Sequence, residues 1–109
     1  MKLNPPSAPP LVSELANEPD LAEILQLFVE ELPQRIAALN DALGREDYQT
    51  IARLAHQLKG AAGGYGFPAI TEVAAQLEKT AALQRDLSRL ATEINELAVL
   101  CGRARAQPE

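Results

Sequence analysis

Apolar residues recur at the spacing of an amphipathic α-helix in four stretches of this 109-residue chain, and short turn-forming segments separate them. The longest stripe consists of Leu21, Ile24, Leu25, Phe28, Leu32, Ile36, Leu39 and Leu43. No stretch has the alternation and length of a credible strand. Apolar residues make up 47% of the chain and aromatic residues only 4%, which favours an Ala- and Leu-rich helical bundle. The sequence therefore predicts an all-α fold, an antiparallel up-down four-helix bundle.

Local signals predict where the first long helix begins and ends. Asp20 is followed three residues later by Glu23, the spacing of a capping box. Gly44 follows the last apolar residue of the stripe and suits the position just after a helix. Pro33 lies inside the pattern and predicts a kink, because proline removes the hydrogen bond to the carbonyl of Val29.

The remaining three helices have comparable signals. Asp47 is the predicted N-cap of a helix that ends at Gly63 or Gly64. Pro68 suits the first position of the next helix, where its missing N–H costs nothing. Asp86 is the predicted N-cap of the last helix.

The N-terminal residues differ in composition from the rest of the chain. Residues 1–9 are proline-rich and are predicted to form a flexible leader. Residues 10–105 are long enough for one domain with its own core. Leu11, Val12 and Leu15 predict a short extra N-terminal helix that covers one end of the bundle.

Charge and cysteine content exclude several classes of function. The net charge of −5 argues against a nucleic-acid partner, because phosphate binding needs a basic surface. No apolar run approaches the roughly 20 residues that span a bilayer, so no membrane partner is expected. The single cysteine, Cys101, excludes an internal disulfide and fits a cytoplasmic location. One histidine and one cysteine cannot build a usual zinc site, so no metal is expected.

The only histidine, His56, lies in the middle of the polar face of its predicted helix. At about 100° per residue, the apolar residues of this stretch centre on the opposite side. Six residues lie within about 60° of the histidine and share its face: Gln49, Ala52, Arg53, Lys59, Gly60 and Gly63. A histidine placed in this way is predicted to be exposed.

This setting limits the chemistry open to His56. The nearest acidic residues along the helix, Glu46 and Asp47, are two to three turns away, so the sequence predicts no orienting carboxylate and no general-base site. An exposed imidazole can still attack a phosphoryl group and carry it. Lys59 would pair with the phosphate charge. Gly60, which costs a helix roughly 1 kcal/mol relative to alanine, would leave room for a donor or acceptor protein.

The run His56-Gln57-Leu58-Lys59-Gly60, with Gly66 ten residues after the histidine, resembles the H-x-L-K-G-x5-G signature of the histidine-containing phosphotransfer (HPt) domain. Further similarity lies in Ala55, in the Gly64–Phe67 run, in Leu77-Glu78, and in the segment of Phe28, Glu31, Leu32, Pro33 and Ile36. The resemblance extends over residues 11–104.

This resemblance implies a four-helix bundle whose histidine passes a phosphoryl group to or from the aspartate of a response-regulator receiver domain. His56 corresponds to the phosphorylated residue, Lys59 to the residue that steadies the phosphate, and Gly60 to the position that admits the receiver. Gly63, on the same helix face, is a second candidate for partner access. Arg53 and Gln57 are candidate docking residues.

The same resemblance implies a phosphoryl carrier with no ATP site and no cofactor of its own, because the receiver supplies Mg²⁺ and the aspartate. The expected partners are a receiver domain, a hybrid histidine kinase or both, and the expected state is a monomer.

Two other interpretations remain open from the sequence. The chain is either a free-standing protein or the phosphotransfer domain of a larger chemotaxis-type or hybrid histidine kinase, which shares the Ala-His-x-Leu-Lys-Gly core. A helical interaction module that has lost phosphotransfer is the second alternative, and the intact set of His56, Lys59 and Gly60 argues against it.

Overall fold

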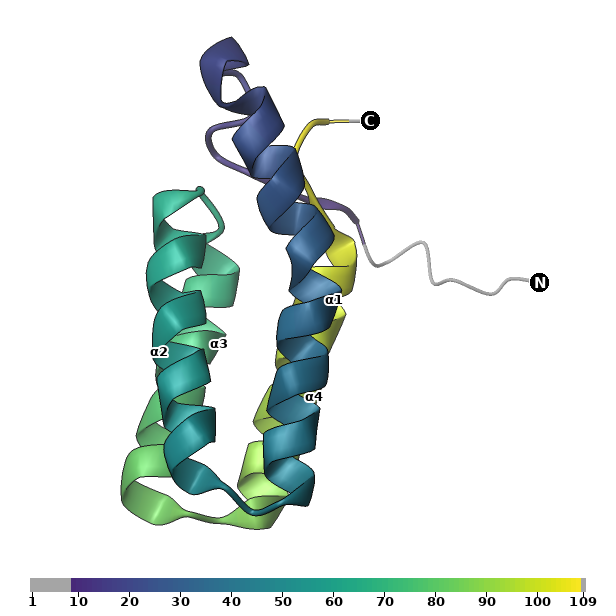
Figure 1. The fold of residues 1–109 in the computed structure, drawn as a ribbon. Coiled ribbons are helices and arrows are strands. Elements are labelled where there is room, and N and C mark those ends of the chain that lie inside the picture. The colour runs from purple at the N-terminus through teal and green to yellow at the C-terminus, as the bar shows by residue number, and fades with distance from the viewer. Residues whose placement is uncertain (1–8, 109) are drawn as a thin grey trace, which may run out of the picture.

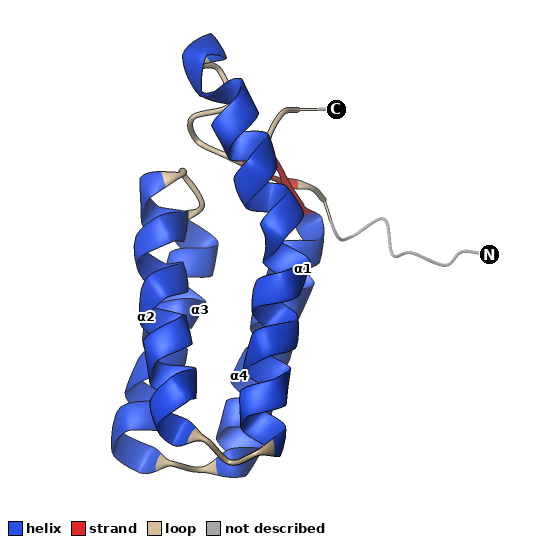
Figure 2. Cartoon of the chain, in the orientation of Figure 1, coloured by secondary structure: helices blue, strands red, loops and turns tan. Residues whose placement is uncertain are grey.

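The computed structural model describes residues 9–108, so most of the predicted leader lies outside the described residues. The elements follow in the order β1 (Leu11–Val12), a 3₁₀ turn η1 (Pro19–Leu21), α1 (Ala22–Gly44), α2 (Tyr48–Gly64), α3 (Pro68–Lys79), a π-helical segment η2 (Thr80–Gln84), α4 (Leu87–Arg103) and β2 (Ala104–Arg105). Figure 2 shows that helices dominate and that the strands are minimal. The predicted all-α fold is confirmed.

Short loops join consecutive helices at alternate ends of the molecule (Figure 1). The loop between α1 and α2 lies at one end, and the loop between α2 and α3 lies at the other. The contact between α2 and α3 is the most extensive of all the helix pairs. These two helices therefore form a hairpin that packs against α1 and α4.

The core is built from the apolar stripes of the four helices. On α2 the buried residues are Ile51, Ala55, Leu58 and Ala62, the face opposite His56. Full burial of one such leucine or isoleucine contributes about 1.5–3 kcal/mol. Ile24 of α1 departs from the predicted stripe, because 43% of its surface is exposed.

Two predicted N-caps and the predicted proline start are confirmed. Asp47 accepts a hydrogen bond from the backbone N–H of Thr50 (3.1 Å) at the start of α2. Asp86 does the same for the N–H of Arg89 (3.2 Å) at the start of α4. Pro68 is the first residue of α3.

The predicted start of α1 is wrong. Asp20 lies inside the 3₁₀ turn η1, and α1 begins at Ala22 without a side-chain cap. The physical reason is Pro19, whose fixed φ starts the turn one residue before the expected cap. Pro33 lies inside α1, and the helix continues through it without a break. Leu32 before the proline and Leu39 after it are both buried, so the same face of the helix packs against the core on both sides of Pro33.

The predicted short N-terminal helix over Leu11, Val12 and Leu15 is also wrong. Leu11–Val12 is a strand that pairs in parallel with Ala104–Arg105. The next residue, Ser13, donates its hydroxyl to the carbonyl oxygen of Tyr65 (2.6 Å), and Leu11 packs against the core. We call residues 11–15 the N-terminal strap. The backbone N–H groups of Ser13 and Glu14 bond to the carbonyl oxygens of Arg105 and Gly66, far along the chain, and this pairing takes the place of a helix.

The N-terminal strap holds the loop between α2 and α3 closely. Glu14 donates its backbone N–H to the carbonyl oxygen of Gly66 (2.8 Å). Gly66 has a φ of 84°, and a Cβ atom built there would lie 2.7 Å from Ser13 Oγ and 2.9 Å from the backbone nitrogen of Glu14. Glycine is required at this position for both conformation and space.

At the far end of α3, a buried polar contact fixes the helix against α4. The hydroxyl of Thr80 lies 3.0 Å from Oε2 of Glu93 on α4, and both residues are buried. This contact falls where α3 passes into η2. Both ends of α3 are therefore anchored, one by the strap and the loop and the other by α4.

Gly66→Ala should lower the free energy of unfolding by about 2 kcal/mol or more, because the new methyl group meets the strap and the backbone is strained. Gly44→Ala is the control, since a Cβ atom there meets nothing within 4 Å and the change should stay within about 1 kcal/mol. Urea denaturation followed by circular dichroism measures both values. Equal stabilities of the two variants would contradict the role assigned to the strap.

Candidate functional site

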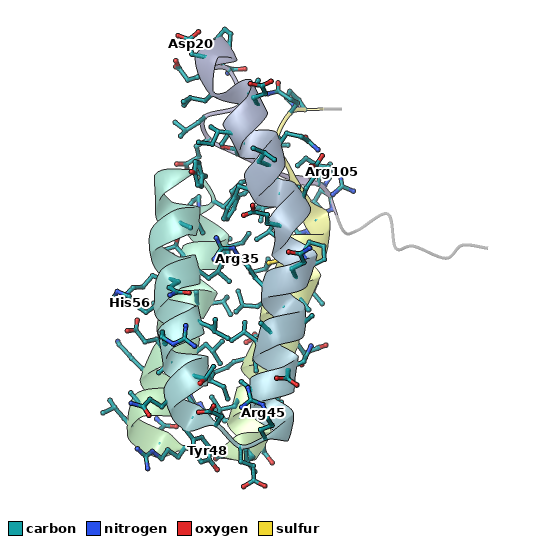
Figure 3. The ribbon with its side chains drawn as sticks, viewed as in Figure 1. Asp20, Arg35, Arg45, Tyr48, His56 and Arg105 are labelled. Atoms are coloured by element: carbon teal, nitrogen blue, oxygen red, sulfur yellow. The ribbon has the colours of Figure 1, made fainter. Side chains whose placement is uncertain are left out.

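His56 projects from the outer face of α2. Figure 3 shows its side chain pointing away from the interior of the bundle. The side chain is 66% exposed, as the angular position on the helix predicts. The imidazole is thus open to a partner molecule.

One carboxylate on α3 contacts two side chains of the α2 polar face. Oε2 of Glu78 lies 3.0 Å from Nδ1 of His56, and Oε1 of Glu78 lies 2.8 Å from Nζ of Lys59. Lys59 and Glu78 are about two-thirds covered, with exposed fractions of 34% and 28%. We call these three residues the His56 cluster.

The charge of Glu78 follows from its partners. The hydrogen bond from Lys59 is the largest influence on the pKa of this carboxyl, and the bond from His56 acts in the same direction. Together they lower the pKa below its ordinary value, although burial opposes them. The carboxyl is therefore ionised at neutral pH, and an ionised carboxylate can only accept hydrogen bonds.

The tautomer of His56 follows from this contact. Because Glu78 accepts, Nδ1 of the neutral imidazole carries the proton. The lone pair then lies on Nε2, on the other edge of the ring. The arrangement leaves Nε2 as the nitrogen of the neutral ring that is able to act as a nucleophile.

The expectation that His56 lacks an orienting carboxylate is wrong. Glu46 and Asp47 are the nearest acidic residues along the chain, whereas the carboxylate that contacts His56 comes from α3. A signal was present in the spacing: His56 and Glu78 are 22 residues apart and lie symmetrically about Phe67, in the loop between the two helices. Residues equidistant from the turn of a helical hairpin lie level with each other, so this symmetry places the carboxylate beside the imidazole.

Gly60 and Gly63 lie on the same exposed side of α2. A Cβ atom at Gly60 would meet nothing within 4 Å, so packing within the described residues does not require glycine there. At Gly63 a Cβ atom would lie 3.6 Å from Oγ1 of Thr71, an ordinary contact. Because glycine has no side chain, nothing projects from the helix at these two positions. The role of Gly60 and Gly63 in partner access stays a prediction.

Arg53 and Gln57 are exposed neighbours of His56 and take no part in the His56 cluster. Between residues 9 and 108, neither side chain makes a hydrogen bond or an ion pair. Both are thus available to a partner, and their docking role also stays a prediction.

The described part of the chain shows the following at other places where a site could lie. No group of three or more His, Cys, Asp or Glu side chains there is arranged to hold a metal ion. None of the described helices is long and apolar enough to cross a membrane. The thiol of Cys101 is largely covered, and burial raises its pKa to about 11.

Comparison with known families identifies the chain. The family model of the Hpt domain matches residues 23–107, and the chain therefore belongs to the Hpt domain family. Neither the curated proteins nor the solved structures give a match. Hpt domains are phosphoryl carriers of two-component phosphorelays, which agrees with an exposed histidine on a helical bundle.

Glu78→Gln should change how stability depends on pH. The folded-state pKa of Glu78 lies below the ordinary value of 4.5, so the ionised carboxylate stabilises the fold above that pH. The advantage of the wild type over the variant should be full near neutral pH and disappear as the pH falls through the folded-state pKa.

Urea denaturation at a series of pH values measures this difference. Glu72→Gln serves as the control, because Glu72 is an exposed carboxylate of the same helix that makes no ion pair with the described residues. A wild-type advantage that does not change with pH would show that the charge of Glu78 has no part in the contact.

Proposed function

We propose that this protein is a histidine phosphotransfer protein that carries a phosphoryl group on Nε2 of His56, to or from the aspartate of a response-regulator receiver domain. The observation that carries the proposal is the contact between Glu78 and Nδ1. It fixes the tautomer that leaves Nε2 as the nucleophilic nitrogen of a side chain that is 66% exposed.

The transfer step needs no proton movement. Nε2 of neutral His56 attacks the phosphorus, the N–P bond forms, and the bond from phosphorus to the aspartate oxygen of the receiver breaks. The aspartate leaves as a carboxylate, while the Nδ1 proton stays in its hydrogen bond with Glu78. The ring then carries the positive charge that balances the transferred group, and the reverse step restores the neutral imidazole.

The neighbouring residues support this step in different ways. Lys59 lies one turn after His56 and supplies a cation that can pair with the phosphoryl oxygens. The open surface at Gly60 lets the receiver bring its aspartate up to the ring. Mg²⁺ and the acceptor carboxylate belong to the receiver, and this chain acts as a carrier without its own cofactor or ATP site.

The wider setting follows from the same role. The antiparallel up-down bundle is a rigid support for His56. The protein acts in the cytoplasm, and it acts as a monomer. Its partners are receiver domains, hybrid histidine kinases or both. The His56 cluster favours an active carrier over a bundle that serves only for protein interaction, because such a module has no use for an oriented imidazole.

His56→Gln should abolish phosphorylation and leave the helical content unchanged. The wild-type chain, mixed with a phosphorylated receiver domain from the same organism, should acquire label that is labile to acid and stable to base. The variant should acquire none, because its side chain has no nucleophilic nitrogen. Label that persists in His56→Gln would place the phosphoryl group elsewhere, and no label in the wild type from any receiver would favour the interaction module.

Gly60→Glu should fold normally and accept the phosphoryl group at least about tenfold more slowly. The new side chain stands in open space, so the fold tolerates it, but it adds bulk and negative charge where the receiver approaches. Gly102→Glu is the matched control, because Gly102 on α4 is equally open and lies on another helix. Rapid-quench transfer assays give the rates, and equal rates for both variants would exclude Gly60 as an access position.

A further inference from the structure

The two oxygens of Glu78 each have one partner. Oε2 contacts Nδ1 of His56 at 3.0 Å, and Oε1 contacts Nζ of Lys59 at 2.8 Å. The ammonium group expected to steady a phosphoryl group is therefore already paired with an anion of the same chain. A phosphoryl group on His56 has to attract Lys59 away from this carboxylate.

Lys59 is able to change partner. Its ammonium is a compact charge at the end of a flexible four-carbon stem, and 34% of the side chain is exposed. The phosphoryl group would sit on Nε2, on the opposite edge of the ring from Glu78, and it carries more negative charge than one carboxylate. The lysine can thus turn from one anion to the other without disturbing the core.

We propose that Lys59 leaves Glu78 for the phosphoryl oxygens when His56 is phosphorylated, and that Glu78 competes with the phosphoryl group for this lysine. The inference rests on the proposed phosphorylation of His56. No covalent bond changes in this exchange, and only the ion pair moves. Its consequence is that Lys59 holds the phosphoryl group less tightly than a free lysine would, so the group stays easy to pass on.

The alternative is that Glu78 positions Lys59 for the phosphoryl group. The two roles predict opposite effects when Glu78 loses its charge. If Glu78 competes for Lys59, removing its charge makes the lysine more available, and the lysine lowers the pKa of the phosphoryl group further. If Glu78 positions Lys59, removing its charge takes this support away, and the lysine lowers that pKa less.

A double-mutant cycle separates the two roles. The full chain is loaded chemically with phosphoramidate, and the phosphoryl group is titrated by ³¹P NMR in the wild type, Lys59→Met, Glu78→Gln and the double variant. Glu78→Gln keeps an oxygen that accepts the Nδ1 hydrogen bond but removes the negative charge. The titration midpoint reports a nearby cation, because a positive charge lowers the pKa of a phosphoryl group.

Lys59→Met should raise the midpoint in both backgrounds, because a cation is lost. The rise should be larger in the Glu78→Gln background by about 0.3–0.7 pH unit, equivalent to roughly two- to fivefold, the strength of a partly exposed ion pair. An equal or smaller rise in that background would overturn the proposed competition. Lys79→Met is the control, since Lys79 is an exposed cation next to Glu78 in the sequence and should give no such difference.

Chemical loading keeps this test separate from the relay itself. A chain that phosphoramidate labels on His56, but that exchanges label with no receiver, would contradict the proposed function while the titrations still decide the role of Glu78. A wild-type chain that takes no label from phosphoramidate would overturn both proposals.

Discussion

The packing of α2 against α3 about Phe67 is the constraint on which the site depends. Phe67 is fully buried and donates its backbone N–H to the carbonyl oxygen of Ala62 (2.9 Å), which closes the turn between the two helices. Positions at equal distances from this turn lie level. Gly63 and Thr71, each four residues from Phe67, lie opposite each other. His56 and Glu78, each eleven residues from Phe67, are in contact. The register that brings Glu78 beside the imidazole is thus set at a turn well away from it, and Glu78 then orients the ring.

The two faces of α2 have separate tasks. Burial of the face with Ile51 and Leu58 supplies the free energy that holds the helix in place. The opposite face contributes little to folding, so it tolerates an exposed histidine and a glycine that costs roughly 1 kcal/mol in a helix. The site can therefore be built for a partner without weakening the core. This division explains why Gly60 stands in open space inside an otherwise good helical sequence.

The parts of the structure predicted correctly from the sequence depend on residues within a few positions of one another. The apolar stripe of α2, the caps at Asp47 and Asp86, and the exposure of His56 all belong to this class. The parts that were missed depend on distant segments. Glu78 meets His56 only because the hairpin closes in one register, and the N-terminal strap forms no helix because its partners lie near residues 66 and 105. Periodicity along one helix carries no information about either contact.

The N-terminal strap lies outside the region that the family model matches. The family match begins at residue 23, whereas Ser13 and Glu14 lie before it and bond to the loop at Tyr65 and Gly66. That loop fixes the register of the hairpin, and through it the distance from the imidazole to its carboxylate. Residues outside the matched region therefore support the geometry of the His56 cluster.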